Sequence, residues 1–366
     1  MGDANCTPVW SIGTAVPSQR IEQDHVLAFM QRYYKADKRL ERRLKYLYRR
    51  SHIAQRYTCC ADFNGAQKPG EELLFGAEEP GTEKRMRVYG EEITGLAEAA
   101  CRNALAGQAG LVATDVTHLI MVTCTGFYAP GPDVDLVGIL GLRPQVQRLQ
   151  IGFMGCQAAL QGLQVADVIC RSDSQAVVLL VCAELCTLHF QSEPTEENLI
   201  INSLFGDGAA AVLLGGTAAS KPLCRMQNFS SFLVPQTREI VTWHIGDRGY
   251  RMGLALTAPA VIRQSLPAFV DHLLAGATLR RDEIDLWAVH PGGRSILDAV
   301  ERVMGLDPQY LAGARAILSN YGNMSSATVL FVLKKVLHEA QDGQRRGVAL
   351  TFGPGLSLEG LTWVRG

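Results

Sequence analysis

The chain has 366 residues, of which 47% are hydrophobic and 19% charged, and its formal net charge is -1. This much apolar material predicts a large core, in one big domain or two fused units. The near-neutral charge argues against a nucleic-acid partner, and no apolar run is long enough for integral membrane association. The 10 cysteines are scattered, with no CxxC pair or zinc-like spacing. We therefore expect a reduced, cytoplasmic setting, no metal site and no signal peptide.

The first 85 residues contain three different patterns. Residues 8–17 predict a short strand that ends in a turn at Pro17, and a long helical region rich in Lys and Arg follows to about residue 50. A charge run on a helix is most often a solvated face, but guanidinium groups also pair with phosphates. Residues 61–85 are rich in Gly, Pro and Glu and predict an irregular surface segment.

From about residue 88 the pattern alternates between helix and strand. A helix through Leu105 is followed by a strand at 117–124 and a helix near 132–141. A further strand leads to Cys156 and its helix, and the next strand lies at 176–183. Continuous apolar strands separated by helices indicate a parallel or mixed sheet covered on both faces, which is the α/β class.

The two halves of the chain resemble each other. Residues 119–126 resemble 286–293, which lie 167 residues further on, and residues 178–182 resemble 348–352, which lie 170 further on. The agreement between these offsets predicts a duplicated α/β unit. Adding 167 to the position of Cys156 gives Asn323, in a polar turn before a second helical pattern. We therefore expect the two residues at equivalent helix starts, facing each other across a pseudo-twofold axis.

Cys156 marks a sharp change of pattern, from strand and tight turn to helical spacing that continues to Ile169. A cysteine at a helix start lies against free backbone N–H groups and the positive end of the helix dipole. With a basic neighbour, such a position lowers a thiol pKa from about 8.5 to roughly 3.5 to 7.5. The alternative is an inert packing cysteine, which is the more common role of a buried thiol.

His290 and Asn323 are the other candidate catalytic residues. His290 ends the strand 286–289 and precedes a Pro-Gly-Gly turn, so its ring is expected beyond the carboxyl end of the strand, where open α/β sheets place their sites. A structural histidine and a helix-capping asparagine are the alternatives. Together with Cys156, they indicate acyl transfer from a thioester. In that chemistry, His290 and Asn323 donate hydrogen bonds to the thioester oxygen that becomes negative when a malonyl thioester loses carbon dioxide.

From roughly residue 8 to its C-terminus, the chain resembles the type III polyketide synthases, the chalcone-synthase-like branch of the thiolase-fold condensing enzymes. The resemblance rests on five motifs: Gly155-Cys156, LFGDGAA at 204–210, VHPGG at 289–293, SNYGNMSS at 319–326 and FGPGL at 352–356. It implies a five-layered α-β-α-β-α thiolase fold made of duplicated βαβαβαβ halves. The first half, 1–216, carries the nucleophile, and the second, 217–366, carries the histidine and asparagine.

The resemblance also implies an activity. A homodimer without metal or redox cofactor loads an acyl-CoA starter on Cys156, extends it repeatedly with malonyl-CoA, and cyclises it to a resorcinol, phloroglucinol or pyrone. Two rivals remain open: a single-round condensing enzyme like ketoacyl-ACP synthase III, and a non-catalytic thiolase-fold scaffold. In the former the histidine turn carries Gln-Ala-Asn instead of Pro-Gly-Gly. A fatty acyl starter is favoured, with a malonyl-only synthase as the competitor within the family.

Motif matches assign further site residues. The gatekeepers between the CoA tunnel and the cavity are Phe205 and Met252, and the other cavity positions are Thr125, His189, Trp243, Ser325, Gly353 and Pro354. Arg43 and Arg50 match cations that bind CoA phosphates in the family, but Tyr46 occupies the middle cationic position.

Three departures from the plant enzymes concern the cavity. Met252 replaces a phenylalanine and Trp243 a glycine, and Ala129 stands where plant enzymes have a methionine that reaches into the partner's cavity. Methionine is flexible, so the passage is expected to be wider, while tryptophan should reshape the cavity. These positions resemble bacterial members more than plant ones.

Overall fold

A large mixed sheet crosses the whole molecule. The computed structural model describes residues 6–64, 73–76, 79–107, 110–218, 220–340 and 343–365. The sheet has nine strands in the order β11-β12-β13-β8-β1-β7-β6-β4-β5. Their bounds are β1 Thr7–Ala15, β4 His118–Thr123, β5 Gln147–Gly152, β6 Val177–Leu185, β7 Asp207–Gly215, β8 Cys224–Leu233, β11 Leu286–Val289, β12 Arg345–Gly353 and β13 Ser357–Arg365. Two separate two-stranded sheets pair β2 Gln19–Glu22 with β3 Gln55–Thr58, and β9 Val241–Gly246 with β10 Gly249–Leu254.

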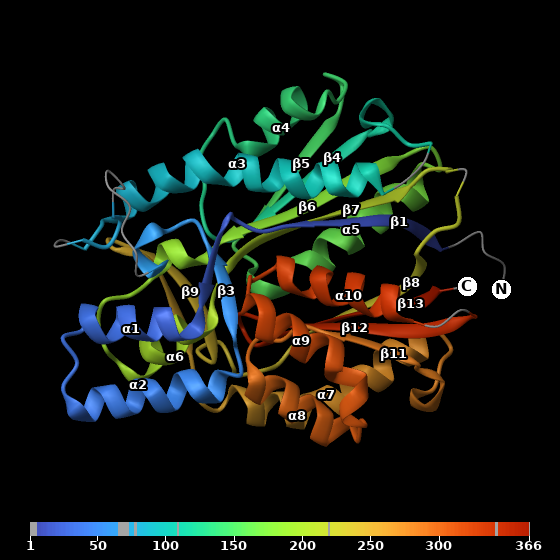
Figure 1. Cartoon of the computed structure of the whole chain (residues 1–366). Helices are drawn as coiled ribbons and strands as arrows, with labels where there is room; N and C mark the ends of the chain where they lie inside the picture. Colours follow the sequence, from blue (N-terminus) through green and yellow to red (C-terminus); the bar gives the residue numbers. More distant parts are fainter. Residues whose placement is uncertain are drawn as a thin grey trace.

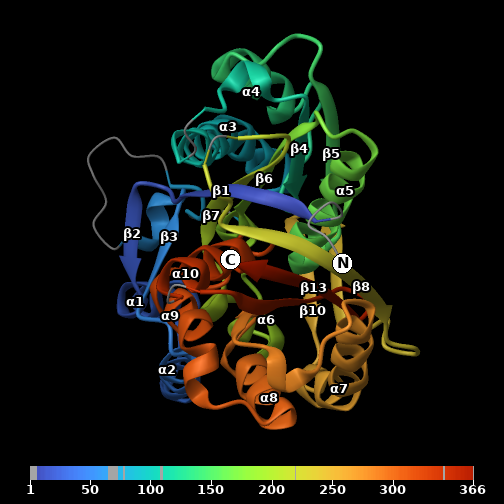
Figure 2. The same cartoon turned by 90° about the vertical axis from the view of Figure 1, so that its right-hand side faces the viewer.

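The helices divide the molecule into five layers (Figures 1 and 2). One outer helix, α3, packs on β1, β6 and β7; α5 and α10 lie between the two parts of the sheet; and α7 packs on β8 and β13 on the opposite outer side. The helix bounds are α1 Gln23–Tyr33, α2 Lys38–Ser51, α3 Thr82–Ala106, α4 Pro132–Leu140, α5 Ala158–Ser172, α6 Glu196–Leu204, α7 Ala258–Gly276, α8 Arg294–Met304, α9 Ala312–Tyr321 and α10 Ala327–Glu339. The predicted α/β class and layered thiolase fold are confirmed.

Strand pairing repeats between the halves, as the offsets predicted. In the first half, β4 pairs parallel with β6 and β6 antiparallel with β7; in the second, β11 pairs parallel with β12 and β12 antiparallel with β13. The halves meet where β1 pairs antiparallel with β8. One element differs between the halves. In chain order, the first half has the strand β5 before α5, whereas the second half has the helix α9 before α10.

The continuous apolar strands are covered on both faces, as predicted, because they lie between two hydrophobic cores. All nine residues of β6 are buried. Val178, Leu180 and Cys182 contact the core around α5 and α10, whereas Leu179 and Val181 contact the core under α3. Because successive side chains of a strand point to opposite faces, a strand covered on both sides needs apolar residues at every position.

The N-terminal region differs from the prediction of one long helix. The chain forms two helices, α1 and α2, because Lys35 adopts a φ of 47° between them and Asp37 starts the second. The Asp37 carboxylate accepts hydrogen bonds from the backbone N–H groups of Arg39 and Leu40, at 2.9 and 2.8 Å, which caps α2.

The predicted irregular segment 61–85 lies only partly within the described residues, since 65–72 and 77–78 fall outside them, and α3 already begins at Thr82. Along the described chain, none of the helices has the length and hydropathy that a membrane span requires.

Candidate active site

One cavity of about 450 Å³ brings together the predicted catalytic residues. Cys156, His290 and Asn323 all line it, although they come from three separate turns of the chain. It is also lined by every predicted gatekeeper and cavity residue, namely Phe205, Met252, Thr125, His189, Trp243, Ser325, Gly353 and Pro354. The described residues contain no cluster of three or more His, Cys, Asp or Glu side chains placed to hold a metal ion.

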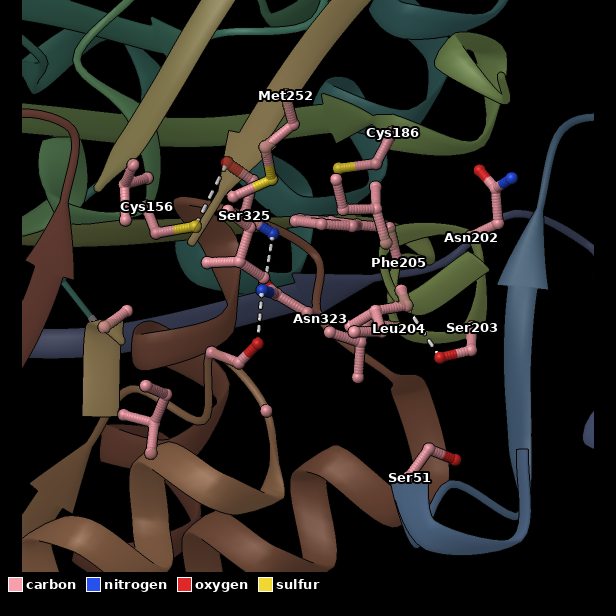
Figure 3. Close-up of a pocket in the computed structure, with 18 of the residues that line it drawn as sticks. Ser51, Cys156, Cys186, Asn202, Ser203, Leu204, Phe205, Met252, Asn323 and Ser325 are labelled. Carbon is pink, nitrogen blue, oxygen red and sulfur yellow. Dashed lines mark hydrogen bonds between the residues drawn. The ribbon is translucent and has the colours of Figure 1, made fainter. Parts of the chain in front are cut away.

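Cys156 lies in a single 3-10 turn, Gly155–Gln157, between β5 and α5. Gly155 has a φ of +72°, and a Cβ added there would lie 2.4 Å from Cδ of Pro354. Only glycine fits this close approach, so the FGPGL loop packs directly on the turn that carries Cys156. Cys156 Sγ points to Ser325 Oγ, 3.9 Å away (Figure 3).

Asn323 connects three segments of the site. Its backbone N–H donates to Leu204 O at 2.9 Å and its carbonyl accepts from the N–H of Gly206 at 3.0 Å, which ties its turn to the segment that carries the gatekeeper. Its side-chain Oδ1 accepts from the N–H of Ser325 at 2.9 Å, and Nδ2 donates to Gly292 O at 3.3 Å (Figure 3). The amide is therefore fixed between its own turn and the histidine turn.

His290 directly follows β11 and is only 1% exposed. Neither ring nitrogen has a hydrogen-bond partner among the described residues. Burial lowers the pKa of His290 to about 3, because the apolar surroundings disfavour an isolated imidazolium. A buried, unpaired imidazole at a cavity wall is available to a ligand as one donor and one acceptor.

Burial opposes the lowered pKa that a helix start with a basic neighbour predicts for Cys156. Burial raises the pKa of this thiol to about 11, and the hydrogen bonds from Ser325 and Asn323 offset only part of the effect. The physical reason is position: Cys156 lies before α5, in the 3-10 turn, and is enclosed by the protein. The free-energy cost of removing an isolated thiolate from water there is larger than the stabilisation that the helix dipole gives it.

An aromatic group forms one wall of the cavity. The Nε2 atom of His189 is 2.7 Å from Thr125 O. Its Nδ1 atom accepts a hydrogen bond from the backbone N–H of Tyr250 at 3.0 Å. The rings of His189 and Tyr250 stack with centroids 4.2 Å apart. Trp243 meets both rings edge-on, and its Nε1 donates to Cys124 O at 2.8 Å. Burial lowers the pKa of His189 to about 3, so this wall is fixed and uncharged.

The two predicted gatekeepers face Cys156 from different elements. Phe205 follows α6 and Met252 lies on β10, where it pairs with Trp243. In Figure 3 both side chains point toward the space beside Cys156 and Ser325. These positions put an aromatic ring and a flexible thioether beside the Cys156 thiol.

Sequence reasoning missed Arg56, which holds the gatekeeper segment. Its buried guanidinium donates through Nη1 to the carbonyl oxygens of Phe205 and Asn202, the latter at 3.0 Å. Arg56 lies on β3, a strand of only four residues. The available signal was a charged residue at an inward position of this strand, but so short a strand gives no reliable period.

Sequence reasoning also missed Glu184, a fully buried carboxyl behind the nucleophile. It accepts hydrogen bonds from Ser326 Oγ at 2.5 Å, Thr125 Oγ1 at 2.8 Å and the N–H of Cys124 at 2.9 Å. Burial raises the pKa of Glu184 despite these donors. A single acid inside the apolar strand 177–185 was a visible signal, because a buried carboxyl needs several partners.

The basic helix α2 borders the mouth of the cavity. Arg50 and Tyr46 line the cavity, and a separate surface hollow of about 430 Å³ is lined by Arg42, Lys45, Tyr46, Arg49 and Arg50. Arg43 is among the lining residues of neither, and its guanidinium forms an ion pair with Glu196. The structure therefore brings only Arg50 of the two predicted CoA cations to the site.

Comparison with known proteins defines the class. The family models for the N-terminal and C-terminal domains of chalcone and stilbene synthases match residues 2–218 and 225–365. A solved structure, PKS-I from the brown alga Ectocarpus siliculosus, superposes with a TM-score of 0.92 at 29% identity, covering 100% of both chains. The fold is thus that of the type III polyketide synthases, which are acyltransferase-type enzymes.

Curated relatives agree with this class. Type III polyketide synthase C of Arabidopsis thaliana is 31% identical, over 96% of this chain and 94% of its own. The alpha-pyrone synthesis polyketide synthase-like Pks18 of Mycobacterium tuberculosis is 33% identical over 77% of this chain and 74% of its own. Probable polyketide synthase 1 of Dictyostelium discoideum is 30% identical over 96% of this chain, which spans only 11% of that relative. The chain belongs to the chalcone and stilbene synthase family.

Proposed function

We propose that this cavity loads an acyl-CoA starter on Cys156, extends it by repeated decarboxylative condensation with malonyl-CoA, and cyclises the product. The observation that carries the proposal is the meeting of Cys156, His290 and Asn323 at one buried cavity. A scaffold without activity would not need an unpaired buried imidazole beside a thiol and a fixed carboxamide.

His290 is the acceptor for the proton of Cys156 in this proposal. Burial disfavours a lone thiolate and a lone imidazolium, so neither group ionises separately. Proton transfer between them creates both charges inside the cavity without changing its net charge, and their attraction offsets part of the cost. The thiolate then attacks the thioester carbonyl, and the sulfur of CoA leaves and takes the proton.

The same imidazole and the Asn323 amide have a second task in the condensation. When a bound malonyl thioester loses carbon dioxide, electron density moves onto its carbonyl oxygen. Donors placed in advance at that oxygen lower the barrier, and because carbon dioxide departs, no base is needed to form the carbanion. Asn323 is held for this role by its contacts with Ser325 and Gly292.

Removal of His290 should change the pH dependence of Cys156 reactivity. In His290→Ala, the thiol should titrate near the high pKa that burial imposes, so iodoacetamide alkylation should rise about tenfold per pH unit between about pH 7 and 10. In the wild type, the reaction should stay fast at neutral pH. Intact-mass kinetics would measure both, with Cys186→Ala correcting for a neighbouring thiol. Identical pH profiles in the wild type and His290→Ala would contradict the proton transfer.

The lining of the cavity favours a fatty acyl starter. Beyond the catalytic residues it continues over aliphatic side chains from several elements, including Ile21, Val26, Met30, Leu47 and Ile200. Burial of such a chain contributes about 0.8 kcal/mol per methylene. The name of Pks18 adds support for a pyrone, while resorcinol and phloroglucinol products remain alternatives.

The decisive assay supplies malonyl-CoA with short, medium and long acyl-CoAs and no carrier protein. We expect cyclised triketides or tetraketides that contain the starter, detected by mass spectrometry. A single condensation product would favour the enzyme type of ketoacyl-ACP synthase III. The same aromatic product with and without acyl-CoA would identify a malonyl-only synthase.

The CoA phosphates are assigned here to the hollow on α2 instead of to Arg43. Its four cations are Arg42, Lys45, Arg49 and Arg50, and it shares Arg50 and Tyr46 with the mouth of the cavity. Guanidinium groups suit phosphates because they offer paired donors in one plane.

Trp243→Gly should lengthen the product. The indole occupies cavity space and closes the aromatic wall through Cys124 O. Its loss should admit a longer starter or at least one further extension, and liquid chromatography with mass spectrometry would show the change. Met252→Leu, a substitution that nearly conserves volume, is the matched control. An unchanged product distribution in Trp243→Gly would show that this side chain does not limit chain length.

Three remaining assignments are proposals of the same kind. The chain is taken to act as a cytoplasmic homodimer, with 1–216 and 217–366 as its thiolase-like halves. Support for the dimer comes from β5, which is an edge strand with exposed Leu149, and from the nearby exposed side chains Phe127 and Met154. Light scattering of the purified protein tests the dimer directly.

A further inference from the structure

A group of exposed cations lies at the junction of α1 with the N-terminal end of α2. Arg32, Lys35, Lys38 and Arg39 form this group, which we call the distal patch. None of them makes an ion pair with a carboxylate of the described residues. The nearest acid in the chain, Asp37, has its carboxylate engaged by the backbone N–H groups of the first turn of α2.

The distal patch lies too far from the cavity to serve the reacting thioester. Tyr46, Leu47, Arg50 and Ser51, from the C-terminal part of α2, line the cavity, and the patch lies at the other end of this helix (Figure 1). Because an α-helix rises 1.5 Å per residue, Lys38 is about 18 Å from Arg50 along the axis. The hollow assigned to the CoA phosphates begins only at Arg42. None of the four patch residues lines the hollow or the cavity, so a CoA thioester held in these two places does not need them.

The charge of α2 is concentrated well beyond the needs of a small ligand. Its 14 residues contain seven Lys or Arg and one acid, Glu41, whereas the whole chain carries -1. All seven cations are exposed. An exposed surface with one sign of charge attracts a partner of the opposite sign and speeds its encounter.

We propose that the distal patch docks an acyl carrier protein, a small acidic protein that presents an acyl thioester on a phosphopantetheine arm. This proposal rests on the proposed function of Cys156. The carrier would contact Lys38 and Arg39 while its arm passes Tyr46 into the cavity. Cys156 sulfur bonds to the acyl carbon, the bond from that carbon to the arm's sulfur breaks, and the released thiolate takes the proton held on His290.

A carrier fits this surface better than an anionic lipid bilayer. Membrane-surface helices need an exposed apolar face beside their cations. On α2 the apolar side is used inside the protein, because Leu44 and Tyr48 are 0% and 3% exposed. The helix packs on α1 and α6, so that side is not free for a membrane.

The test compares two donors of the same acyl group on one enzyme. Lys38→Glu/Arg39→Glu reverses two charges of the patch, and neither residue is among those that line the hollow or the cavity. Single-turnover loading of Cys156, followed by intact mass, should slow at least about tenfold from acyl-carrier protein and change less than about twofold from acyl-CoA. Wild-type loading from the carrier should fall as salt is raised from about 50 to 500 mM, and this dependence should weaken in the variant.

A matched control reverses two exposed cations elsewhere. Arg143 follows α4 and Lys221 lies between β7 and β8, so Arg143→Glu/Lys221→Glu makes the same change in net charge away from α2. We expect wild-type loading from both donors in this control. If loading from acyl-carrier protein slowed equally in both double variants, the slowing would be an effect of net charge, and the proposed docking site would be overturned.

Two further results would overturn the proposal. One is wild-type loading from acyl-carrier protein that is no faster than from free acyl-phosphopantetheine. The other is binding of the protein to phosphatidylglycerol vesicles that depends on Lys38 and Arg39, while carrier loading is unchanged by their reversal. Failure of the proposed function has a different signature, namely no acyl adduct on Cys156 from acyl-CoA.

Discussion

Asn323→Asp is expected to slow malonyl-CoA decarboxylation by about 10² to 10³ while acyl loading on Cys156 stays within about threefold of the wild type. One lost donor to a developing oxyanion typically has an effect of that size. The aspartate keeps an acceptor for the N–H of Ser325 and for Thr328 Oγ1, so the turn is retained. It removes the Nδ2 donor and puts a carboxylate where the enolate oxygen develops.

The two readouts separate catalysis from folding. Release of carbon dioxide from malonyl-CoA measures the first, and intact mass after incubation with acyl-CoA measures the second. Asn323→Ala is the comparison variant, because it loses the donor and also the contacts that hold Ser325 and Gly292. A parallel loss of loading and decarboxylation in Asn323→Asp would mean that the residue only maintains the shape of the cavity.

The sequence could predict Asn323 because its signal is local and repeated. Agreement between two strand offsets located it opposite Cys156, and glycine-rich turns marked both helix starts. The structure confirms that repeat in the pairing of β4 with β6 and of β11 with β12. The same reasoning could not show that α9 replaces β5, since the repeat covers the strands that flank this segment and not the segment itself.

The thiol pKa illustrates a different limit. The helix start at Cys156 was visible in the sequence, but the burial that raises its pKa was not, because the cavity around the thiol is lined by segments that are distant in sequence. Arg56 and Glu184 escaped prediction for the same reason. Each is a buried charged residue, and its partners lie about 60 or more residues away along the chain. Sequence spacing carries no information on such partners.

Cys156→Ala should abolish acyl loading and polyketide formation, with a loss of at least about 10⁴ in product turnover, as for other enzymes without their nucleophile. Decarboxylation of malonyl-CoA should remain within a few-fold of the wild type, because His290 and Asn323 supply its donors and the thiol takes no part in that step. This is the reverse of the pattern expected for Asn323→Asp, so the pair of variants divides the cavity into a loading function and a decarboxylation function.

Cys186→Ala is the matched control for Cys156→Ala, because Cys186 is a second free thiol on the wall of the same cavity. Burial raises the pKa of Cys186 well above its ordinary value, and Cys186 lies in the 3-10 turn that follows β6, outside the motifs that mark the predicted catalytic residues. Loading and product should therefore survive its removal. An acyl adduct that persists in Cys156→Ala and disappears in Cys186→Ala would transfer the nucleophile to Cys186. A thiol needs an acceptor for its proton to attack at neutral pH, and the proposed mechanism gives this role at Cys156 to the unpaired ring of His290.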